Sequence, residues 1–314
     1  MNKTQIRHSL ILLLTAVIWG VAFVAQSVGM DYVGPFTFTC VRSFIGGLVL
    51  IPCIALLQRG SRRAGKEGDA PAEQKYSEKG KNSRWMLLAG GVCCGLALCA
   101  ASCFQQFGIQ YTTVGKAGFI TAFYIIIVPV ISLFFGKKCG ILVWVSVLLA
   151  LGGLYFLCIT ESFRIGTGDI LVFICAFLFA VHILVIDYFT RYVDGVKMSC
   201  IQFFVCGAVS GIAMLLFETP SLSAVLNAWQ PVLYAGVLSS GAGYTLQIIG
   251  QKGMNPTVAS LILSLESVVS VLAGLLILGQ TLSGREVLGC VLMSAAIVLA
   301  QLPQKMPQKK TKPA

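Results

Sequence analysis

A single carboxylate interrupts one of the most apolar runs in the chain. The segment LILSLESVVSVLAGLLILG, residues 261–279, is hydrophobic or small at nearly every position except Glu266. If this run lies in a lipid bilayer, a charge near its centre costs at least ~2.5–3.5 kcal/mol. A carboxyl group in such a place can bind a cationic group, carry a proton, or hold helices together through hydrogen bonds. Glu266 is therefore a candidate binding or coupling residue, with the helix-holding role as the alternative.

Arg42 is a second charged side chain inside an apolar run, residues 35–57. At 1.5 Å per residue it lies roughly 10 Å from one side of the run, and Glu266 lies roughly 15 Å from the other side. In a hydrocarbon core ~30 Å thick these depths differ by about 5 Å, so the two side chains are able to meet. A guanidinium keeps its charge and needs several acceptors. The sequence favours a structural Arg42 bonded to carbonyls or a carboxylate, with binding of a substrate carboxylate as the sharper alternative.

Other polar and aromatic side chains within the apolar runs are also candidates. Amides are buried reluctantly without partners, so they either join helices or select a zwitterionic solute. A lysine near a helix end either reaches the interface or lines the mouth of an outward vestibule. A lone intramembrane histidine is more often structural than a proton relay, and aromatic residues either pack in the core or form cavity walls. These candidates are Lys116, Tyr124, Gln105, Gln106, Gln247, His182, Trp19 and Tyr244.

The composition places these residues in a membrane protein. The 314 residues are 57% hydrophobic and 11% charged, with a mean hydropathy of +0.86, whereas a soluble domain carries about 25% charged residues. Runs of about 20 apolar residues, which can cross ~30 Å of hydrocarbon, alternate with short polar breaks. We therefore predict an all-α integral membrane protein with ten transmembrane helices. They are expected at 9–29, 35–57, 85–107, 114–135, 140–159, 170–188, 199–217, 229–250, 256–278 and 286–302.

The basic residues are distributed unevenly between the two sides of this ten-helix plan. If the N-terminus is cytoplasmic, 19 of the 23 Lys and Arg residues fall on the cytoplasmic side, three fall outside, and Arg42 lies within a helix. Such an excess predicts a multi-pass protein of the cell membrane with both termini in the cytoplasm. The net charge of +11 then reflects orientation, so no nucleic-acid partner is expected. Residues 58–84 are expected to form a polar cytosolic loop and residues 303–314 a basic cytosolic tail.

Two parts of the chain resemble each other. CVRSF at 40–44 matches CIQFF at 200–204 with an offset of 160, and FGIQYTTVGKA at 107–117 matches IGQKGMNPTVA at 249–259 with an offset of 142. These matches predict two five-helix units, residues 1–159 and 160–302. Because five is odd, the second unit would start from the opposite face, which makes the units inverted repeats around a site near the midplane. In this register Tyr124 aligns with Glu266.

The residue inventory argues against several other classes of protein. The 12 cysteines show no CxxC pair, so they are expected to be buried small hydrophobes, with no metal or cofactor. The two histidines, His8 and His182, have no acidic pair within reach, so no set of residues for intramembrane catalysis is evident and an enzyme is not expected. A channel would prefer rings of like groups from repeated subunits, and a sensor would need a further soluble domain.

The pattern resembles the drug/metabolite transporter superfamily, EamA type. The likeness rests on the early WG pair at 19–20, on VRSF at 41–44, and on LILSLESVVSVLAGLLILGQTLSGREVLGCVLMSAAIVLAQ at 261–301. The family's ninth helix usually reads Leu-Glu-Pro and ends in Gly-Glu. Here Leu-Glu is present, but Ser267 stands at the usual proline and Gln280 at the usual glutamate. The resemblance implies a ten-helix inner-membrane carrier with two EamA repeats, usually exporting amino acids or other small metabolites.

Together these observations predict a secondary active transporter that moves amino acids or related small metabolites across the cytoplasmic membrane by alternating access. Export is the expected direction, import of the same solutes is the alternative, and a membrane channel or sensor is a weaker one. The sequence contains no GxxxxGK[ST] motif for ATP, so a proton or solute counter-gradient is expected to drive transport. The expected partners are the lipid bilayer and a small-molecule substrate, and the oligomeric state stays open.

Overall fold

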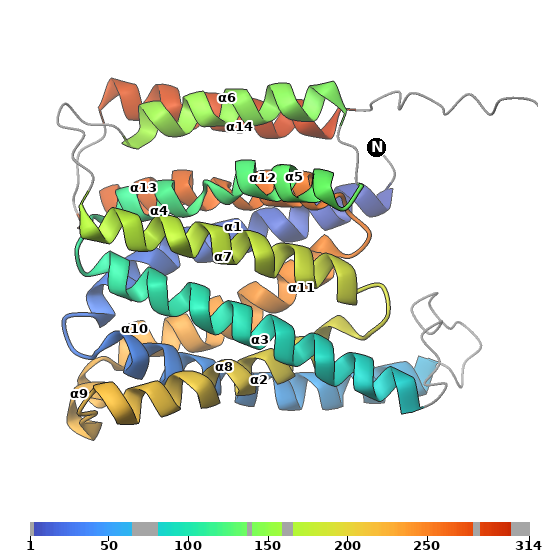
Figure 1. Cartoon of the computed structure of the whole chain (residues 1–314), viewed down its shortest axis with the longest axis vertical. Coiled ribbons are helices and arrows are strands. Elements are labelled where there is room, and N and C mark those ends of the chain that lie inside the picture. The colour runs from blue at the N-terminus through green and yellow to red at the C-terminus, as the bar shows by residue number, and fades with distance from the viewer. Residues whose placement is uncertain (1–2, 65–80, 137–139, 159–165, 279–282, 303–314) are drawn as a thin grey trace, which may run out of the picture.

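The computed structural model describes residues 3–64, 81–136, 140–158, 166–278 and 283–302. Within these ranges every regular element is a helix (Figure 1). The predicted tail at 303–314 lies outside the described residues, as does most of the predicted loop at 58–84, although the two ends of that loop are helical. The elements are α1 (Lys3–Gly29), α2 (Pro35–Ala64), α3 (Lys81–Ile109), α4 (Val114–Thr121), α5 (Tyr124–Phe134), α6 (Ile141–Cys158), α7 (Thr167–Phe189), α8 (Gly195–Phe217), α9 (Leu222–Asn227), α10 (Trp229–Leu233), the π-helical η2 (Tyr234–Tyr244), α11 (Thr245–Gln251), α12 (Pro256–Leu263), α13 (Leu265–Leu278) and α14 (Gly284–Gln301).

Eight helical segments among the described residues are long and apolar enough to cross a membrane. They are Thr4–Gly29, Pro35–Leu56, Arg84–Ile109, Val114–Phe134, Thr167–Phe189, Gly195–Phe217, Trp229–Gln251 and Pro256–Ile277. The other two expected spans correspond to shorter apolar stretches, Ile141–Gly153 in α6 and Val287–Ala300 in α14. The helices that contain these stretches have 18 residues each, which corresponds to about 27 Å, close to the ~30 Å of a hydrocarbon core. The all-α membrane fold is therefore supported, and the count of ten spans stays a prediction.

The surface of the bundle carries the side chains that a soluble protein would bury. Leu48 on α2, Leu215 on α8 and Leu276 on α13 are among many large hydrophobic residues that face outward. The interior is correspondingly rich in polar groups, including Arg42 and Glu266, which are 3% and 4% exposed. This reversal fits a bilayer, where apolar groups face lipid and polar groups are satisfied within the protein.

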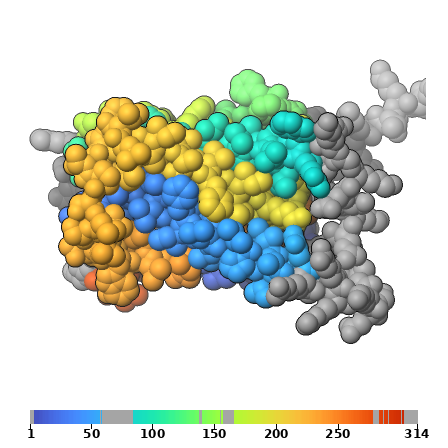
Figure 2. Space-filling view, turned by 90° about the horizontal axis from the view of Figure 1, so that it is seen from below, coloured from blue at the N-terminus to red at the C-terminus, as the bar shows by residue number. Residues whose placement is uncertain are grey.

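The helices are arranged in successive layers (Figure 1). The α6–α14 pair forms one edge, the broken helices α4/α5 and α12/α13 lie next, α1 and α7 follow, and α2 and α8 form the opposite edge. Viewed from that second edge, α2 lies between α8 and the orange segment that leads into the eighth span (Figure 2). We call the end of the bundle that carries α9 and the starts of α2, α4 and α7 the α9 face. The opposite end, where α1 begins, is the N-terminal face.

The contact between α2 and α8 is reciprocal. A Cβ added at Gly47 would lie 3.1 Å from the Phe204 ring, and a Cβ added at Gly207 would lie 3.1 Å from the Phe44 ring. The two phenyl rings are 6.2 Å apart between centroids. Each phenylalanine therefore packs over the glycine of the other helix. The two glycines, and likewise the two phenylalanines, differ by the offset of 160 residues seen in the sequence.

Two spans are broken at matching positions. The fourth is divided between α4 and α5 at residues 122–123, and the ninth is divided between α12 and α13 at Ser264. The offset of 142 residues superimposes residue 122 on 264 and the capped start of α4 on that of α12, where Thr113 and Asn255 bond to backbone N–H groups. A break frees backbone carbonyls inside the membrane, and these require donors.

Serine hydroxyls supply several of these donors around the second break. Ser260, Ser264, Ser267 and Ser270 each donate to the carbonyl oxygen three residues earlier, at 2.7–2.9 Å. Such local bonds from serine satisfy helical carbonyls and often accompany a bend. The serines of residues 260–270 thus have a structural role beside the glutamate that they flank.

Candidate functional site

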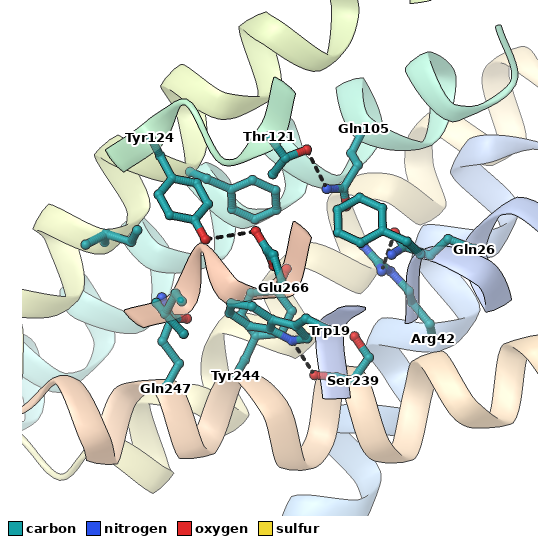
Figure 3. A pocket seen from close by; sticks show the side chains of 14 residues that line it. Trp19, Gln26, Arg42, Gln105, Thr121, Tyr124, Ser239, Tyr244, Gln247 and Glu266 are labelled. Carbon is teal, nitrogen blue, oxygen red and sulfur yellow. Dashed lines mark hydrogen bonds between the residues drawn. The ribbon is translucent and has the colours of Figure 1, made fainter. Parts of the chain in front are cut away.

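A cavity lies in the middle of the bundle, where the two broken helices face α1, α2, α3, α7 and the eighth span (Figure 3). It measures about 30 Å³, which leaves room for about one or two water molecules. Its lining combines aromatic, amide and charged side chains. They are Trp19, Phe23, Gln26, Arg42, Gln105, Thr121, Tyr124, Phe179, Ile183, Ser239, Tyr244, Gln247, Leu263 and Glu266.

Glu266 and Tyr124 meet across the cavity. The Tyr124 hydroxyl donates to Glu266 Oε1 at 2.8 Å, and both side chains are buried (Figure 3). Tyr124 is the first residue of α5, and Glu266 lies in the first turn of α13. The breaks therefore bring both groups to the N-terminal ends of half-helices, where the helix dipole favours negative charge. This arrangement explains how a carboxyl group is held in the interior of the bundle.

Arg42 lies on another wall of the cavity and has few partners. Its Nη1 donates to Gln26 Oε1 at 3.3 Å, and its guanidinium carbon lies 5.9 Å from the centre of the Phe38 ring. Among the described residues this is the only hydrogen bond of the Arg42 guanidinium, although a guanidinium has five N–H donors. The structure shows no direct bond between Arg42 and Glu266 among these residues. The cavity thus contains a buried cation, most of whose donors have no hydrogen-bond partner in the part of the chain that the structure describes.

Amide and aromatic groups complete the lining. Gln105 Nε2 donates to Thr121 Oγ1 at 3.4 Å, whereas Gln247 Oε1 is buried with no hydrogen-bond partner among the described residues. Trp19 Nε1 donates to the Ser239 carbonyl oxygen of η2 at 3.2 Å, and its ring lies 4.6 Å from that of Tyr244. A π-helix leaves irregular backbone that often marks functional sites.

The cavity is lined by residues that the repeat register pairs with one another. The offset of 142 pairs the fourth-span and third-span positions with those of the ninth and eighth spans, and the offset of 160 pairs α1 with α7. Five such pairs line the cavity together, so it lies between parts of the chain that the predicted repeat register pairs. The pairs are Tyr124/Glu266, Thr121/Leu263, Gln105/Gln247, Trp19/Phe179 and Phe23/Ile183.

Three of the predicted candidates do not line the cavity. Lys116 Nζ forms an ion pair with Asp169 Oδ2 at 2.6 Å, at the α9 face. Gln106 Nε2 donates to Met30 Sδ at 3.4 Å. His182 Nε2 lies 3.1 Å from Gln202 Oε1, behind the Tyr244 ring.

Other residues were missing from the sequence-based candidates. Gln26 is a lone amide in an apolar run, a signal of the same kind as Gln105, and could have been included. Asp169 lies one residue before the apolar run predicted from residue 170, so it is not a polar residue within such a run. The backbone contribution of Ser239 depends on the π-helix, which the sequence pattern does not indicate.

A helical bundle with an apolar surface and a central cavity that contains buried charged and amide side chains fits a membrane transport protein. The sequence profile of the EamA-like transporter family matches this chain twice, over residues 7–159 and residues 166–302. The chain therefore belongs to the EamA-like transporter family and is an EamA-type permease of the drug/metabolite transporter superfamily. This membership points to transport rather than catalysis.

Individual relatives agree with this assignment. An uncharacterized transporter from Archaeoglobus fulgidus is 28% identical over 292 residues, which cover 93% of this chain and 84% of the relative. The uncharacterized transporter YoaV from Bacillus subtilis is 22% identical, covering 90% of this chain and 92% of the relative. A crystal structure with 20% identity superimposes with a TM-score of 0.73 over 94% of this chain and 96% of the other, which shows a shared fold.

Proposed function

We propose that this permease moves amino acids or related small zwitterionic metabolites across the cell membrane, with export as the direction, and that they bind in the central cavity. The observation that carries the proposal is the buried Arg42, whose donors are mostly unused, facing a cavity that also contains Glu266. A solute carboxylate would take up the Arg42 donors as charge-assisted hydrogen bonds. A solute ammonium group would find acceptors in the Glu266 carboxyl and in Gln247 Oε1.

The transport cycle that we propose is alternating access between two inverted five-helix repeats. Its support is the double match of the family profile, the reciprocal α2–α8 packing and the matching helix breaks beside Tyr124 and Glu266. Broken helices at the interface between repeats are a recurrent setting for transporter binding sites. A cavity of about 30 Å³ is too small for an amino acid, so the lining helices would separate when solute enters. Under the positive-inside rule the N-terminal face is cytoplasmic.

The experiment is uptake of a panel of labelled amino acids into inverted membrane vesicles, with and without a proton gradient. The wild-type protein is compared with Arg42→Gln, Glu266→Gln and a control variant, Arg191→Gln. Arg191 is a matched control because it is half-exposed and pairs with Asp187 within α7, away from the cavity. Removing a hydrogen bond to a charged group costs ~1.5–3 kcal/mol, so Arg42→Gln should weaken the apparent affinity for a transported amino acid by about tenfold or more.

Each result has a distinct meaning. Uptake by the wild type that Arg42→Gln weakens and Arg191→Gln does not supports the cavity as the binding site. Unchanged affinity in Arg42→Gln would remove Arg42 from the site. Uptake in right-side-out vesicles alone would make the protein an importer. Loss of gradient dependence in Glu266→Gln would connect that carboxyl group to a proton counter-gradient.

A further inference from the structure

A second polar cluster joins the starts of two helices at the α9 face, away from the cavity. Asp169 Oδ2 accepts hydrogen bonds from Lys116 Nζ at 2.6 Å and from the Gly166 backbone N–H at 2.8 Å. Its other oxygen, Oδ1, accepts from Thr112 Oγ1 at 2.8 Å. The Asp169 side chain is 7% exposed and that of Lys116 is 27% exposed. One carboxylate therefore connects the first turn of α7 to the first turn of α4 and to the turn before it.

Close backbone packing lies beside this cluster. A Cβ at Gly108, near the end of α3, would overlap Val172 Cγ2, and a Cβ at Gly168 would lie 2.8 Å from the Gly108 carbonyl oxygen. The start of α7 thus fits tightly against the end of α3. Because α3 and α4 belong to the first family match and α7 to the second, any opening of the α9 face between them must break this contact.

A separate tie crosses between the two matched segments at the same face. Glu218, which follows α8, accepts from the backbone N–H groups of Phe36 and Thr37, both at 2.8 Å, and from Thr37 Oγ1 at 2.6 Å. The carboxylate thereby satisfies orphan donors at the N-terminus of α2. The α9 face is therefore held across the two matched segments by two carboxylates, Asp169 in α7 and Glu218 directly after α8.

The repeat register predicts no counterpart for the first tie at the N-terminal face. The offset of 142 places Val258 at the position of Lys116, and the offset of 160 places Ser9 at the position of Asp169. A valine and a serine cannot form an ion pair. In the predicted repeat register, the ionic contact that joins α4 to α7 at the α9 face therefore has no equivalent between α12 and α1 at the N-terminal face.

We propose that Asp169, acting through Lys116 and Thr112, is the positioning residue of a latch that holds the α9 face closed. The latch must release before the cavity opens to that side, a role that rests on the proposed alternating access. Asp169 and Lys116 lie in the first turns of α7 and α4, so a separation of these two helices breaks the charge-assisted bonds without unfolding either helix. These charge-assisted bonds form again when α4 and α7 come back together, so they favour the closed arrangement. Opening at the α9 face therefore requires that they break first.

The test is hydrogen exchange, followed by mass spectrometry, on the full-length protein in lipid nanodiscs without added solute. Lys116→Met removes the ion pair but keeps the Asp169 cap of α7. It is compared with Asp169→Asn and with the variant that carries both changes. Lys116→Arg is the conservative replacement, because it keeps the positive charge. Asp187→Asn is the matched control, since Asp187 is also a buried carboxylate of α7 that pairs with a cation, Arg191, but at the N-terminal face.

We expect Lys116→Met to speed exchange in residues 108–118 and 166–172 by about three- to tenfold, with residues 186–198 unchanged. Adding Asp169→Asn should produce less than the product of the two single effects, Lys116→Arg should stay close to wild type, and Asp187→Asn should leave residues 108–118 unchanged. Unchanged exchange in Lys116→Met, multiplicative effects in the double variant, or faster exchange throughout the protein would overturn the latch. The exchange readout needs no substrate, so a failure of the amino-acid transport assay would be distinguishable from a failure of the latch.

Discussion

The hydrogen bond between Tyr124 and Glu266 offers a sharp test of the site, because one oxygen atom can be removed without changing the shape of the cavity wall. In Tyr124→Phe the donor that lies 2.8 Å from Glu266 Oε1 is lost and the ring remains. Leaving one buried polar partner unsatisfied costs ~1–3 kcal/mol. We therefore expect Tyr124→Phe to lower stability by about that amount, which is a large effect for deletion of a single hydroxyl.

The assay is thermal unfolding of the purified protein in detergent, followed by intrinsic fluorescence. For soluble chains of 150–250 residues about 1 kcal/mol corresponds to about 2–4 °C in the unfolding midpoint, so a fall of several degrees is expected here. The matched control is Tyr111→Phe, which removes the same hydroxyl from a side chain that is 67% exposed at the α9 face. That control should shift the midpoint by less than about 1 °C, because substitutions on the surface change stability little.

A double-mutant cycle with Glu266→Met then decides whether the two groups act together. Methionine has a similar length and neither carboxylate oxygen, so each single variant of the cycle removes the Tyr124–Glu266 hydrogen bond. Coupled residues in contact show an interaction energy of about 0.5–3 kcal/mol. Equal midpoints for Tyr124→Phe and Tyr111→Phe, or strictly additive effects in the cycle, would refute the reasoning that this bond holds the carboxyl group in the cavity.

Three further predictions concern helix packing and capping. Gly47→Ala and Gly207→Ala, in which each new methyl meets a phenyl ring at 3.1 Å, should each cost ~1 kcal/mol and match one another within ~0.5 kcal/mol in unfolding assays; a larger difference would contradict the reciprocal contact. Gly20→Ala places a Cβ 2.8 Å from the Glu266 carbonyl oxygen, so it should lower stability by ~2 kcal/mol or more and reduce vesicle uptake. Glu218→Gln should cost ~0.5–1 kcal/mol and speed hydrogen exchange at the start of α2, whereas unchanged exchange would show that the charge is dispensable there.

The membrane class of the protein could be predicted from composition, because a helix of about 20 apolar residues has the length that is needed to cross the hydrocarbon core. The breaks at residues 122–123 and 264 could not, since neither directly follows a proline, the first lies in a plain apolar run and the second in an apolar run with serines. The bounds of α6 and α14, in contrast, agree within two residues with the spans predicted at 140–159 and 286–302, because hydropathy marks where an apolar run begins and ends.

The contact in the site that follows from the repeat register could be predicted from the sequence. The hydrogen-bond partners of Arg42 and Lys116 could not. The offset of 142 aligns Tyr124 with Glu266, and the two side chains form a hydrogen bond in the structure. Depth alone allowed Arg42 to meet Glu266, yet its guanidinium bonds to Gln26, 16 residues earlier on the preceding helix. Lys116 was placed at a helix end correctly, but its partner Asp169 lies 53 residues away on another helix. Such pairings depend on helix rotation, which span boundaries do not fix.

The equivalent positions that face each other in the cavity carry different chemistry, and this difference has a physical reason. Two glutamates at the positions of Tyr124 and Glu266 would place like charges together in a low dielectric, so they would have to share a proton. A phenol opposite a carboxyl group instead supplies a donor whether or not the carboxyl is charged. On the proposed inverted-repeat plan, matched backbones would make the two orientations similar in energy. The unmatched side chains would then give the cavity one cationic and one acidic wall, which an asymmetric solute such as a zwitterion requires.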